Sequence, residues 1–533
     1  MTGVDVCVVG AGPVGLTLAI ALRRLGLAVR VVDRAPAAKR EARALVVWPR
    51  AAEALEALGV LGGLRRNAVE LGEVTVHGGG RRLGELVTGW QRSAHGRPLN
   101  IEQHDIERLL CEELARLGTG VEWDTEVTDV KVHDDRAEFV LRLPDASVES
   151  ATAAWIVGCE GTASVVRDRL GIAFEGRRRT GLQVVQGNAH ADWPYGYRPG
   201  HGHIFLAPHR SLLVFPLPGG GFRFFCFRDD PDPTLTAPPT LDELRDLVAD
   251  TARLPGLRLS PSEPPWLNRA RFSDRVAARL RRGRGLLAGD AAHAWAPVGG
   301  HGMNVGMLGA HNLAWKLAAV HRGDADERLL DTYSTEQRAL ALRYIREMRL
   351  NFMELPLPPL GYRVFSAAVP VALALSRFQQ HIDLRLSDLG RNHRSSTLSW
   401  QRAAGCRRGG GPRAGDRMPD ARVRTGGPGT MPVRLHTLLA YDRWTLFLDA
   451  ARAAGGAVRA ALEERCAHGP VPVRVQPLSP ADPAEARLLG RPGELRLVRP
   501  DGYVGLVAPV DRPEVLAAYL AALAPQPPSA TTQ

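Results

Sequence analysis

The N-terminal segment changes its hydrophobic period twice. An apolar, β-branched run, VDVCVV, precedes a stretch in which Leu18, Leu22 and Leu25 recur at helical spacing, and the run LAVRVVD follows and ends at Asp33. β-branched runs favour strands, and apolar residues three or four apart favour one face of a helix. The pattern therefore predicts a strand, a helix and a second strand, which together form a βαβ unit of the α/β fold class.

Three glycines in GxGxxG spacing separate the first strand from the helix. Gly10 allows a tight turn, Gly12 lets a pyrophosphate approach the backbone, and Gly15 lets helix and strand pack closely. Asp33, at the end of the second strand, suits a ribose hydroxyl. The unit predicts a dinucleotide site without distinguishing NAD from FAD. Its predicted contacts are Gly10, Gly12, Pro13, Val14, Gly15, Asp33 and Arg34.

A second glycine-rich turn comes before a long helical pattern. Gly289 and Asp290 follow an apolar run, and after Pro297 the chain reads VGGHGMN before an apolar-faced helix begins. The first N–H groups of a helix have no internal partner, and the helix dipole is positive there. The stretch therefore predicts a socket for a negatively charged group, with Gly300, Gly302, Met303 and Asn304 around it.

The middle of the chain has the period of a β-sheet. Residues 176–274 contain alternating, aromatic-rich runs joined by a glycine-rich hairpin, as in HIFLAPHRSLLVFPLPGGGFRFFCFRD. The apolar residues of these runs include Phe205, Leu213, Phe215, Phe224 and Phe225, and alternate residues must pack the sheet.

The C-terminal part has its own order of predicted strands and helices. After a Gly/Pro/Arg-rich linker, residues 405–522 predict strand, helix, strand, strand and helix, an order that resembles a thioredoxin-like domain. Because it has no CxxC pair, dithiol exchange is excluded, and packing or dimerisation is its expected role. Residues 523–533 predict a disordered tail.

Composition narrows the class of protein. The chain has 533 residues, of which 45% are hydrophobic and 23% charged, enough for several globular domains. The net charge is +11, but the arginines are spread along the chain without a nucleic-acid-binding signature, so no nucleic-acid partner is expected.

The cysteines and the hydrophobic runs indicate in which cellular compartment the protein is expected. The six cysteines form no CxxC, which disfavours zinc and disulfide sites and fits a reducing cytoplasm. No signal peptide is visible. Val364–Phe378 is too short to span a bilayer and contains Pro370, so we expect a buried or substrate-facing helix and no membrane partner.

These motifs together resemble the FAD-dependent aromatic hydroxylases, single-component flavoprotein monooxygenases related to 4-hydroxybenzoate and phenol hydroxylase. The GxGxxG motif at Gly10, a DG-type motif in GCEGTASVVRDRLG and a GD motif in GLLAGDAAHAWAP each have a counterpart in that family. The resemblance implies a Rossmann-like FAD-binding domain formed by residues 1–175 and 275–395. It also implies an inserted β-sheet substrate domain at 176–274 and a thioredoxin-like domain at 405–522, as in polyketide-tailoring members. In the family the sheet of the substrate domain covers a cavity over the flavin, so the resemblance makes the five apolar residues named above candidates for its lining.

The resemblance also implies roles for single residues. Asp290 contacts the ribityl chain of FAD, the loop after Pro297 surrounds the pyrimidine end of the flavin, and Arg43 and Gln103 contact the phosphate and ribityl region. The further cofactor contacts that it implies are Glu160, Gly161, Gly289 and Pro297.

Three positions depart from the family's pattern. Glu160 replaces an aspartate, which keeps the carboxylate of the implied NAD(P)H or pyrophosphate contact but lengthens the side chain, and Gly309 replaces an acid. His301 replaces a glutamine. A histidine beside flavin either titrates near neutral pH and tunes the site or is a tolerated polar substitute.

The implied activity is monooxygenation of an aromatic, phenolic or polycyclic small molecule. In the family NADPH or NADH reduces FAD, O2 adds at flavin C4a, and the hydroperoxide transfers its distal oxygen to the ring. Baeyer–Villiger oxygen insertion, epoxidation and antibiotic inactivation remain alternatives on the same fold, and a flavin-bound scaffold is an alternative from another class. The sequence singles out no catalytic base, no metal ligand and no assembly beyond a candidate homodimer.

Overall fold

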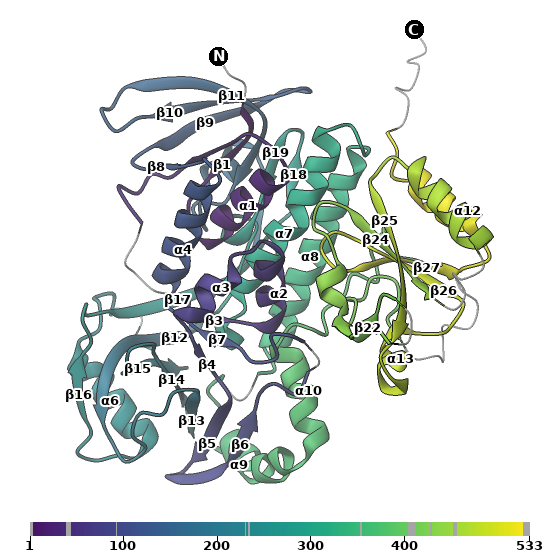
Figure 1. Cartoon of the computed structure of the whole chain (residues 1–533). Helices are drawn as coiled ribbons and strands as arrows, with labels where there is room; N and C mark the ends of the chain where they lie inside the picture. The colour runs from purple at the N-terminus through teal and green to yellow at the C-terminus, as the bar shows by residue number, and fades with distance from the viewer. Residues whose placement is uncertain are drawn as a thin grey trace.

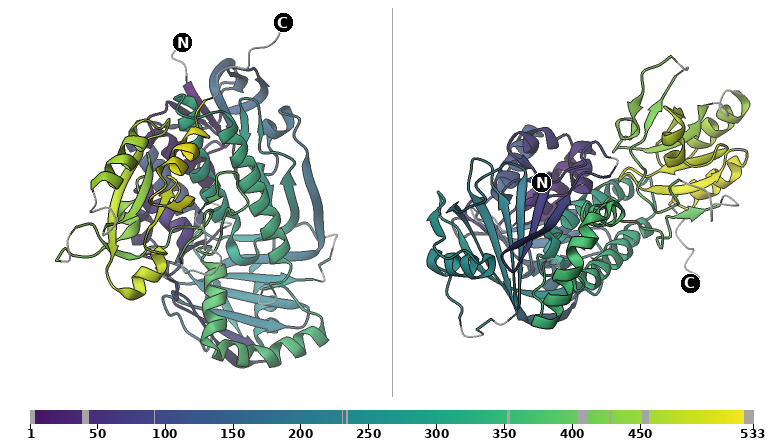
Figure 2. Two further views of the ribbon diagram at one scale, coloured as in Figure 1. Left: turned by 90° about the vertical axis from the view of Figure 1, so that its right-hand side faces the viewer. Right: turned by 90° about the horizontal axis from the view of Figure 1, so that it is seen from below.

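The computed structural model of the chain describes residues 4–38, 44–91, 93–229, 231–232, 235–351, 354–402, 411–426, 429–450 and 456–525. Figure 1 shows one sheet above another, with a third sheet beside them. The long helices α7 (Gly302–His321) and α8 (Arg328–Met348) stand between the upper sheet and the third one, as Figure 2 shows from two further sides. The predicted α/β class is confirmed.

The upper sheet contains the predicted βαβ unit. β1 (Val4–Val9) pairs in parallel with β2 (Val29–Val32) and β11 (Val148–Gly158), and α1 (Pro13–Arg24) joins β1 to β2 and packs on α7. The sheet is completed by β8 (Val121–Glu122), β9 (Glu126–Val132), β10 (Ala137–Arg142), β18 (Arg281–Arg282) and β19 (Gly285–Leu287). The middle of β1 is wholly buried because a parallel sheet is covered on both faces.

Short elements connect this layer to the rest. A small sheet joins β3 (Val46–Val47), β4 (Val69–Glu70) and β7 (Leu99–Asn100). The helices of this part are α2 (Pro49–Ala57), α3 (Leu61–Arg66), α4 (Gln103–Arg116) and α5 (Val165–Arg169).

The lower sheet has nine strands and two unlike faces. Helix α6 (Leu241–Ala252) covers one face, while α8 and α9 (Pro359–Ala374) pack on the other. The strands are β5 (Glu73–Gly78), β6 (Arg81–Val87), β12 (Phe174–Asp192), β13 (His201–Ala207), β14 (Arg210–Pro216), β15 (Phe222–Arg228), β16 (Arg258–Pro261), β17 (Leu267–Ala277) and β20 (His293–Ala294).

This sheet extends beyond the residues that the sequence assigned to it. β5 and β6 belong to the segment predicted to bind FAD, yet β5 pairs in parallel with β13. A pairing between strands more than a hundred residues apart leaves no trace in local periodicity, which explains why the boundary at 176 misses them.

The third sheet lies in the C-terminal part. β24 (Trp444–Asp449) pairs in parallel with β25 (Val473–Pro480) and antiparallel with β26 (Glu494–Val498), which pairs antiparallel with β27 (Val504–Pro509). This order agrees with the predicted thioredoxin-like arrangement. The remaining elements are β21 (Trp400–Gln401), β22 (Arg422–Arg424), β23 (Val433–Arg434), α12 (Gly456–Ala467), α13 (Pro483–Leu489) and α14 (Pro513–Ala521).

Two details of the C-terminal part differ from the sequence interpretation. β21 precedes the predicted start at 405 and joins the sheet through β27. Helix α13, which the sequence interpretation omitted, begins where Asp482 accepts hydrogen bonds from Ala484 N–H and Glu485 N–H. The predicted tail lies outside the described residues from 526 onward.

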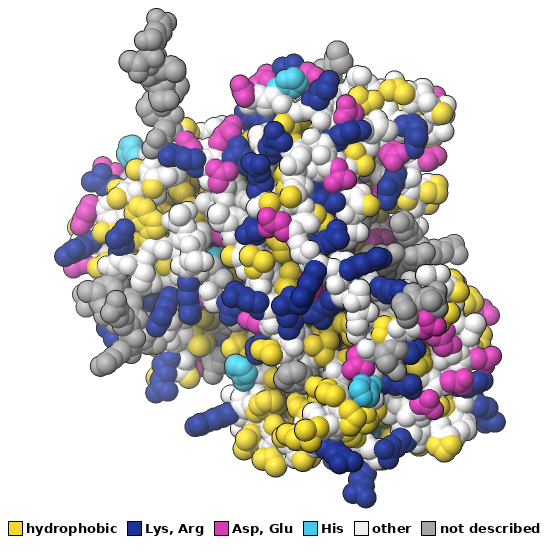
Figure 3. All heavy atoms as spheres, turned by 180° about the vertical axis from the view of Figure 1, so that it is seen from behind, with side chains coloured by type: hydrophobic (Ala, Val, Ile, Leu, Met, Phe, Trp, Pro, Cys, Tyr) yellow, Lys and Arg dark blue, Asp and Glu magenta, His cyan; other side chains and the backbone are white. Residues whose placement is uncertain are grey.

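The segment Val364–Phe378 was expected to form a buried or substrate-facing helix; burial is wrong, and contact with substrate stays a prediction. α9 ends at Ala374, α10 (Ser376–Leu386) leaves it at an angle of 100°, and Val364 and Val371 are about two thirds exposed. The exposed face is apolar, and Figure 3 shows hydrophobic side chains gathered low on that side of the molecule. In the described residues no single helix is long and apolar enough to cross a membrane, and only the bent pair α9–α10 passes that test by length and composition.

Candidate active site

The start of α1 has the form of an anion site. Gly10 has φ +105°, and a side chain there would press on the backbone of Cys159 at 2.7 Å. A side chain at Gly15 would collide more severely, since an added Cβ would lie 1.9 Å from the carbonyl oxygen of Gly10. A Cβ on Gly12, by contrast, would meet no atom within 4 Å, and no side chain caps the helix there. Pro13 opens the helix, so the N–H groups of its first turn border open space.

Asp33 lies beside this turn. Its carboxylate accepts hydrogen bonds from Ala11 N–H at 2.7 Å and from Ala35 N–H at 2.8 Å, which fix it at the end of β2. A carboxylate has about four acceptor positions, so two remain for hydroxyl groups of a ligand. Arg34, the next residue, is exposed.

The Gly–Asp turn packs directly on the first turn of α1. Gly289 has φ +60°, and an added Cβ would lie 3.0 Å from the side chain of Val14. Gly306 of α7 meets the same side chain, at 2.5 Å. Val14 therefore fills a space that two glycines leave open, and the first turn of α1, the Gly–Asp turn and α7 meet at this side chain. Asp290 is exposed beside it.

A loop of residues 299–304, called the flavin loop below, connects the Gly–Asp turn to α7. It follows Pro297, and Gly299 and Gly300 both have positive φ, +78° and +64°. α7 begins at Gly302 without a side-chain cap, and Met303 is half-buried. As at α1, the first N–H groups of a helix are thus directed out of a glycine-rich turn.

Two side chains tie the flavin loop to the first domain. Asn304 accepts a hydrogen bond from Trp48 N–H at 2.8 Å and donates to Val46 O at 2.8 Å and Gly300 O at 2.9 Å. The Trp48 indole donates to Gly299 O at 2.9 Å. Asn304 was predicted as a cofactor contact, but in this arrangement its side chain holds the loop.

His301 points away from the open side of the loop into a buried network. Its Nδ1 lies 3.0 Å from Asp388 Oδ2, its ring stacks on Trp48, and Tyr344 donates to Asp388 at 2.5 Å. Burial by itself would raise the pKa of Asp388, but the attraction of His301 and Arg391 holds it below its usual value. The histidine is therefore a partner of a buried carboxylate.

The remaining predicted contacts lie around this core. Gln103, at the start of α4, accepts from Ala44 N–H at 3.1 Å and donates to Glu107 at 2.8 Å. Arg43, the residue before Ala44, lies outside the described residues.

Glu160 faces inward. One carboxylate oxygen accepts from Val166 N–H at 2.8 Å and so caps α5, and the other is buried without a partner among the described residues. Burial raises the pKa of this carboxyl. Gly161 follows with φ +86° and open space around its Cα.

The apolar candidates of the lower sheet divide between its two faces. Phe205 and Phe224 pack under α6 in one cluster, away from the flavin loop. Phe215 and Phe225 pack against the cluster that contains Trp48 and lie near the loop, while Leu213 packs in the cluster under α8 and α9. The alternation of strand side chains explains the division, so Phe205 and Phe224 are wrong as cavity-lining candidates.

The sequence analysis missed Arg223. It is fully buried, donates to Glu102 at 2.8 Å and to Asn188, and lies 4.0 Å from the ring centre of Trp266. Burial lowers its pKa to about 10. A lone arginine inside the aromatic run FRFFCF, on the same alternating face as Phe225, was the available signal.

No group of three or more His, Cys, Asp or Glu side chains suited to a metal ion occurs in the parts of the chain that the structure describes.

Comparisons with known proteins agree with this geometry. Residues 3–348 match the family described as FAD binding domain, and residues 411–527 match the one described as aromatic-ring hydroxylase, C-terminal. A 6-methylpretetramide 4-monooxygenase of Streptomyces rimosus is 34% identical over 98% of this chain and 94% of its own length.

Solved structures extend the similarity to the whole fold. The anhydrotetracycline hydroxylase OxyS from Streptomyces rimosus has a TM-score of 0.74 at 26% identity and covers 99% of this chain and 100% of its own. Aklavinone-11 hydroxylase, solved with FAD and aklavinone, has a TM-score of 0.74 at 25% identity, covering 97% and 98%.

Proposed function

The chain belongs to the family of FAD-dependent aromatic-ring monooxygenases, and from that premise we propose that it hydroxylates a phenolic or polycyclic, polyketide-like small molecule with O2 and NADPH or NADH. The observation that carries the proposal is the packing of Val14 between Gly289 and Gly306. This contact brings together two uncapped helix N-termini and the Gly–Asp turn. A long ligand with a diphosphate at one end and a polar ring at the other matches such a site.

The residues present fit FAD. The open space at Gly12 and the uncapped start of α1 suit the diphosphate, and the free acceptor positions of Asp33 suit a ribose. Asp290 and Gln103 would bind the ribityl region, and the flavin loop would surround the pyrimidine end. When bound, FAD supplies the redox centre that takes up electrons from NAD(P)H and activates O2.

The chain's own contribution is charge stabilisation and orientation. The first N–H groups of α7, from Gly302 onward, would stabilise negative charge on a flavin ring bound in front of them. Trp48 and Asn304 hold these groups in place before any ligand binds, so little reorganisation is needed.

The aromatic substrate would lie between the flavin loop and the lower sheet. Phe215 and Phe225 present apolar surface there, next to Trp48 and Leu217. Apolar walls orient a flat ring and exclude water from the reacting carbon. The structure offers no group that we assign as a catalytic base.

NAD(P)H would bind transiently. The sequence has no second GxGxxG unit, and Glu160 is turned inward onto α5, so its predicted contact with the nicotinamide donor remains a prediction. The cytoplasmic location, the absence of nucleic-acid and membrane partners and the homodimer likewise remain predictions.

A substrate screen tests the proposed function. Purified protein with FAD is incubated with NADPH, isotopically labelled O2 and a panel of phenolic and polycyclic aromatic compounds, while NADPH oxidation and product mass are followed together. We expect one compound to stimulate NADPH oxidation and to gain one labelled oxygen with its ring intact. A labelled lactone or epoxide would favour the alternative reactions. If no compound stimulated NADPH oxidation and none gained labelled oxygen, the result would contradict an oxygenase.

A further inference from the structure

The hairpin between β26 and β27 ends in a buried turn. Residues 499–503, called the hairpin tip, read Arg-Pro-Asp-Gly-Tyr, and each of them is buried. Turns normally run over the surface because their polar backbone needs water. A turn that carries Arg499 and Asp501 into the interior therefore requires strong partners from the rest of the molecule.

Those partners lie on α7 and α8. Arg499 donates to Glu336 at 2.7 and 3.0 Å and to Asp501 at 3.0 and 2.5 Å. Asn312 donates to Asp501 at 2.7 Å, and Lys316 donates to Glu336 at 2.8 Å. Two cations and two carboxylates thus balance each other, which is the condition under which buried charges are tolerated.

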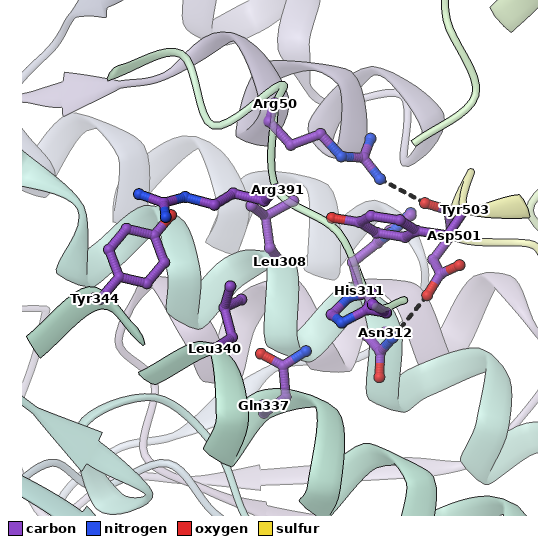
Figure 4. Close-up of a pocket in the computed structure, with 11 residues that line it drawn as sticks. Arg50, Leu308, His311, Asn312, Gln337, Leu340, Tyr344, Arg391, Asp501 and Tyr503 are labelled. Atoms are coloured by element: carbon purple, nitrogen blue, oxygen red, sulfur yellow. Dashed lines mark hydrogen bonds between the residues drawn. The ribbon is translucent and has the colours of Figure 1, made fainter. Parts of the chain in front are cut away.

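The hairpin tip also holds the start of α2. Arg50 donates from Nη2 to the carbonyl oxygen of Asp501 at 2.6 Å, and its guanidinium carbon lies 4.9 Å from the ring centre of Tyr503, as Figure 4 shows. Glu53, one turn further along α2, accepts from Arg417 of the C-terminal part. The C-terminal part therefore contacts α2 at Arg50 and at Glu53, which lie one helical turn apart.

Arg50 is two residues beyond Trp48. Trp48 binds Gly299 O through its indole and Asn304 through its backbone, so the hairpin tip connects to the flavin loop through a short path of hydrogen bonds and chain. Pro49 lies between them and limits backbone rotation at the start of the helix.

A small cavity lies beside these contacts, lined by residues of the hairpin tip, α2, α7 and α8. It measures about 10 Å³, close to the space that one water molecule needs. Four lining side chains each have a buried polar atom without a partner among the described residues: Arg50 Nε, His311 Nε2, Asn312 Oδ1 and Gln337 Oε1. Figure 4 shows these side chains around the space between the hairpin tip and the two helices, with Arg50 on the side of the hairpin tip and Gln337 on α8.

We propose that the hairpin tip is a positioning element of the flavin site, which fixes Arg50 and, through Trp48, the flavin loop. The inference rests on the role proposed above for that loop. It gives the C-terminal part a function in cofactor binding at a distance, without redox chemistry. Cys466, which is buried with a pKa raised to about 12, is not needed for it.

The test compares Arg50→Leu with Arg50→Lys. The side chain of lysine keeps one donor, whereas leucine has none. In protein labelled with 5-fluorotryptophan and free of FAD, the resonance of Trp48, assigned with Trp48→Phe, is expected to shift in Arg50→Leu and to return toward the parent position in Arg50→Lys. The FAD dissociation constant is expected to rise about tenfold in Arg50→Leu and less in Arg50→Lys.

Arg459→Leu is the matched control. Arg459 lies on the outer helix α12, is exposed and pairs only with Glu463 in the described residues, so the same change there is expected to leave both signals unaltered. Asp501→Asn probes the C-terminal side and is expected to shift the same resonance. An unchanged Trp48 resonance or an unchanged FAD affinity in folded Arg50→Leu overturns the proposal. Because the resonance is read without FAD, that failure is distinct from failure of the proposed oxygenation, which the substrate screen reports.

Discussion

Single side chains that the sequence predicted as cofactor contacts differ in burial and in their partners within the protein. Asn304 uses its amide oxygen and nitrogen on Trp48, Val46 and Gly300. Asp290 lies exposed on the Gly–Asp turn, fourteen residues before Asn304. The sequence predicted both as cofactor contacts, and only the structure shows that one of them is buried and holds the loop.

Asp290→Ala is expected to weaken FAD binding at least tenfold. In the proposed site the Asp290 carboxylate would accept a charge-assisted hydrogen bond from a ribityl hydroxyl, and such bonds contribute about 1.5–3 kcal/mol. The melting temperature of the FAD-free variant is measured as well, so that a loss of FAD binding is separated from a loss of stability. FAD titration followed by flavin fluorescence measures the effect.

Asp331→Ala is the control for that change, since Asp331 is exposed on α8 and pairs with Arg281 away from the flavin loop. A purified Asp290→Ala protein as yellow as the parent, with an equal FAD dissociation constant, would sink the assignment.

At the scale of one element, α1 shows two glycines of one motif with different functions. Gly15 is required by the fold because its Cβ would collide with Gly10 O at 1.9 Å. Gly12 has φ −74°, and a methyl group added to it would meet no atom within 4 Å, so the fold alone does not require it. A ligand over the helix end would account for the missing side chain, and glycine is also a favourable N-cap residue.

Gly12→Ala and Gly15→Ala are therefore expected to fail in different ways. Gly12→Ala keeps the urea stability of the FAD-free protein within about 0.5 kcal/mol, as for other surface substitutions, but lowers FAD affinity. Gly15→Ala lowers the stability itself by about 1–3 kcal/mol, because the helix must move away from β1. Urea unfolding without FAD and FAD titration separate the two. Equal losses of stability in both variants would show that Gly12 is also a packing residue.

At the scale of the whole molecule, histidines buried in different layers act together on stability. His293 and His393 have pKa values lowered to about 4, and His311 to about 3, because burial disfavours the charged ring. Unfolded histidine has a pKa of about 6.5, so below that pH the unfolded chain binds more protons than the folded one. Stability is therefore lost as the pH falls from about 6.5 toward 4.

Each of these histidines is expected to contribute a slope of about 1.4 kcal/mol per pH unit in that window. His393→Gln is expected to reduce the slope by that amount, measured by urea unfolding of the FAD-free protein between about pH 5 and 7, chosen to lie on both sides of the unfolded pKa. His468→Gln, at an exposed position, is the control. Identical slopes in the parent and His393→Gln would contradict the argument.

The arrangement of the motifs also bears on the order of substrate binding and flavin reduction. One dinucleotide fingerprint serves FAD, and no second GxGxxG unit is present for the nicotinamide donor. Gly299 and Gly300, with positive φ, give the flavin loop a backbone that most residues do not adopt. We therefore expect flavin reduction to depend on a conformational step that substrate favours.

Reduction by NADPH is expected to be slow in the isolated protein and faster once a verified aromatic substrate is present. Stopped-flow absorbance of the flavin, with and without that substrate, measures it, and a saturated analogue of similar size is the control. Equal reduction rates would refute the gating and leave the oxygenase assignment standing.

By itself the sequence determined the local features of this protein. GxGxxG spacing, the Gly–Asp turn and the change from period 2 to period 3.6 identified the FAD-binding unit, the sheet of residues 176–274 and the C-terminal order of elements. These features are local because a turn conformation and the face of a helix or strand depend on residues only a few positions apart.

Only the tertiary structure decided which distant segments meet. β5 and β6 belong to the lower sheet, and Phe205 and Phe224 pack on its α6 face. His301 lies within hydrogen-bond distance of Asp388. Arg50 met the carbonyl of Asp501, more than four hundred residues away. Such pairs depend on how the layers pack against one another. Local periodicity does not predict them, because it identifies the face of an element that is buried but not the residues that cover that face.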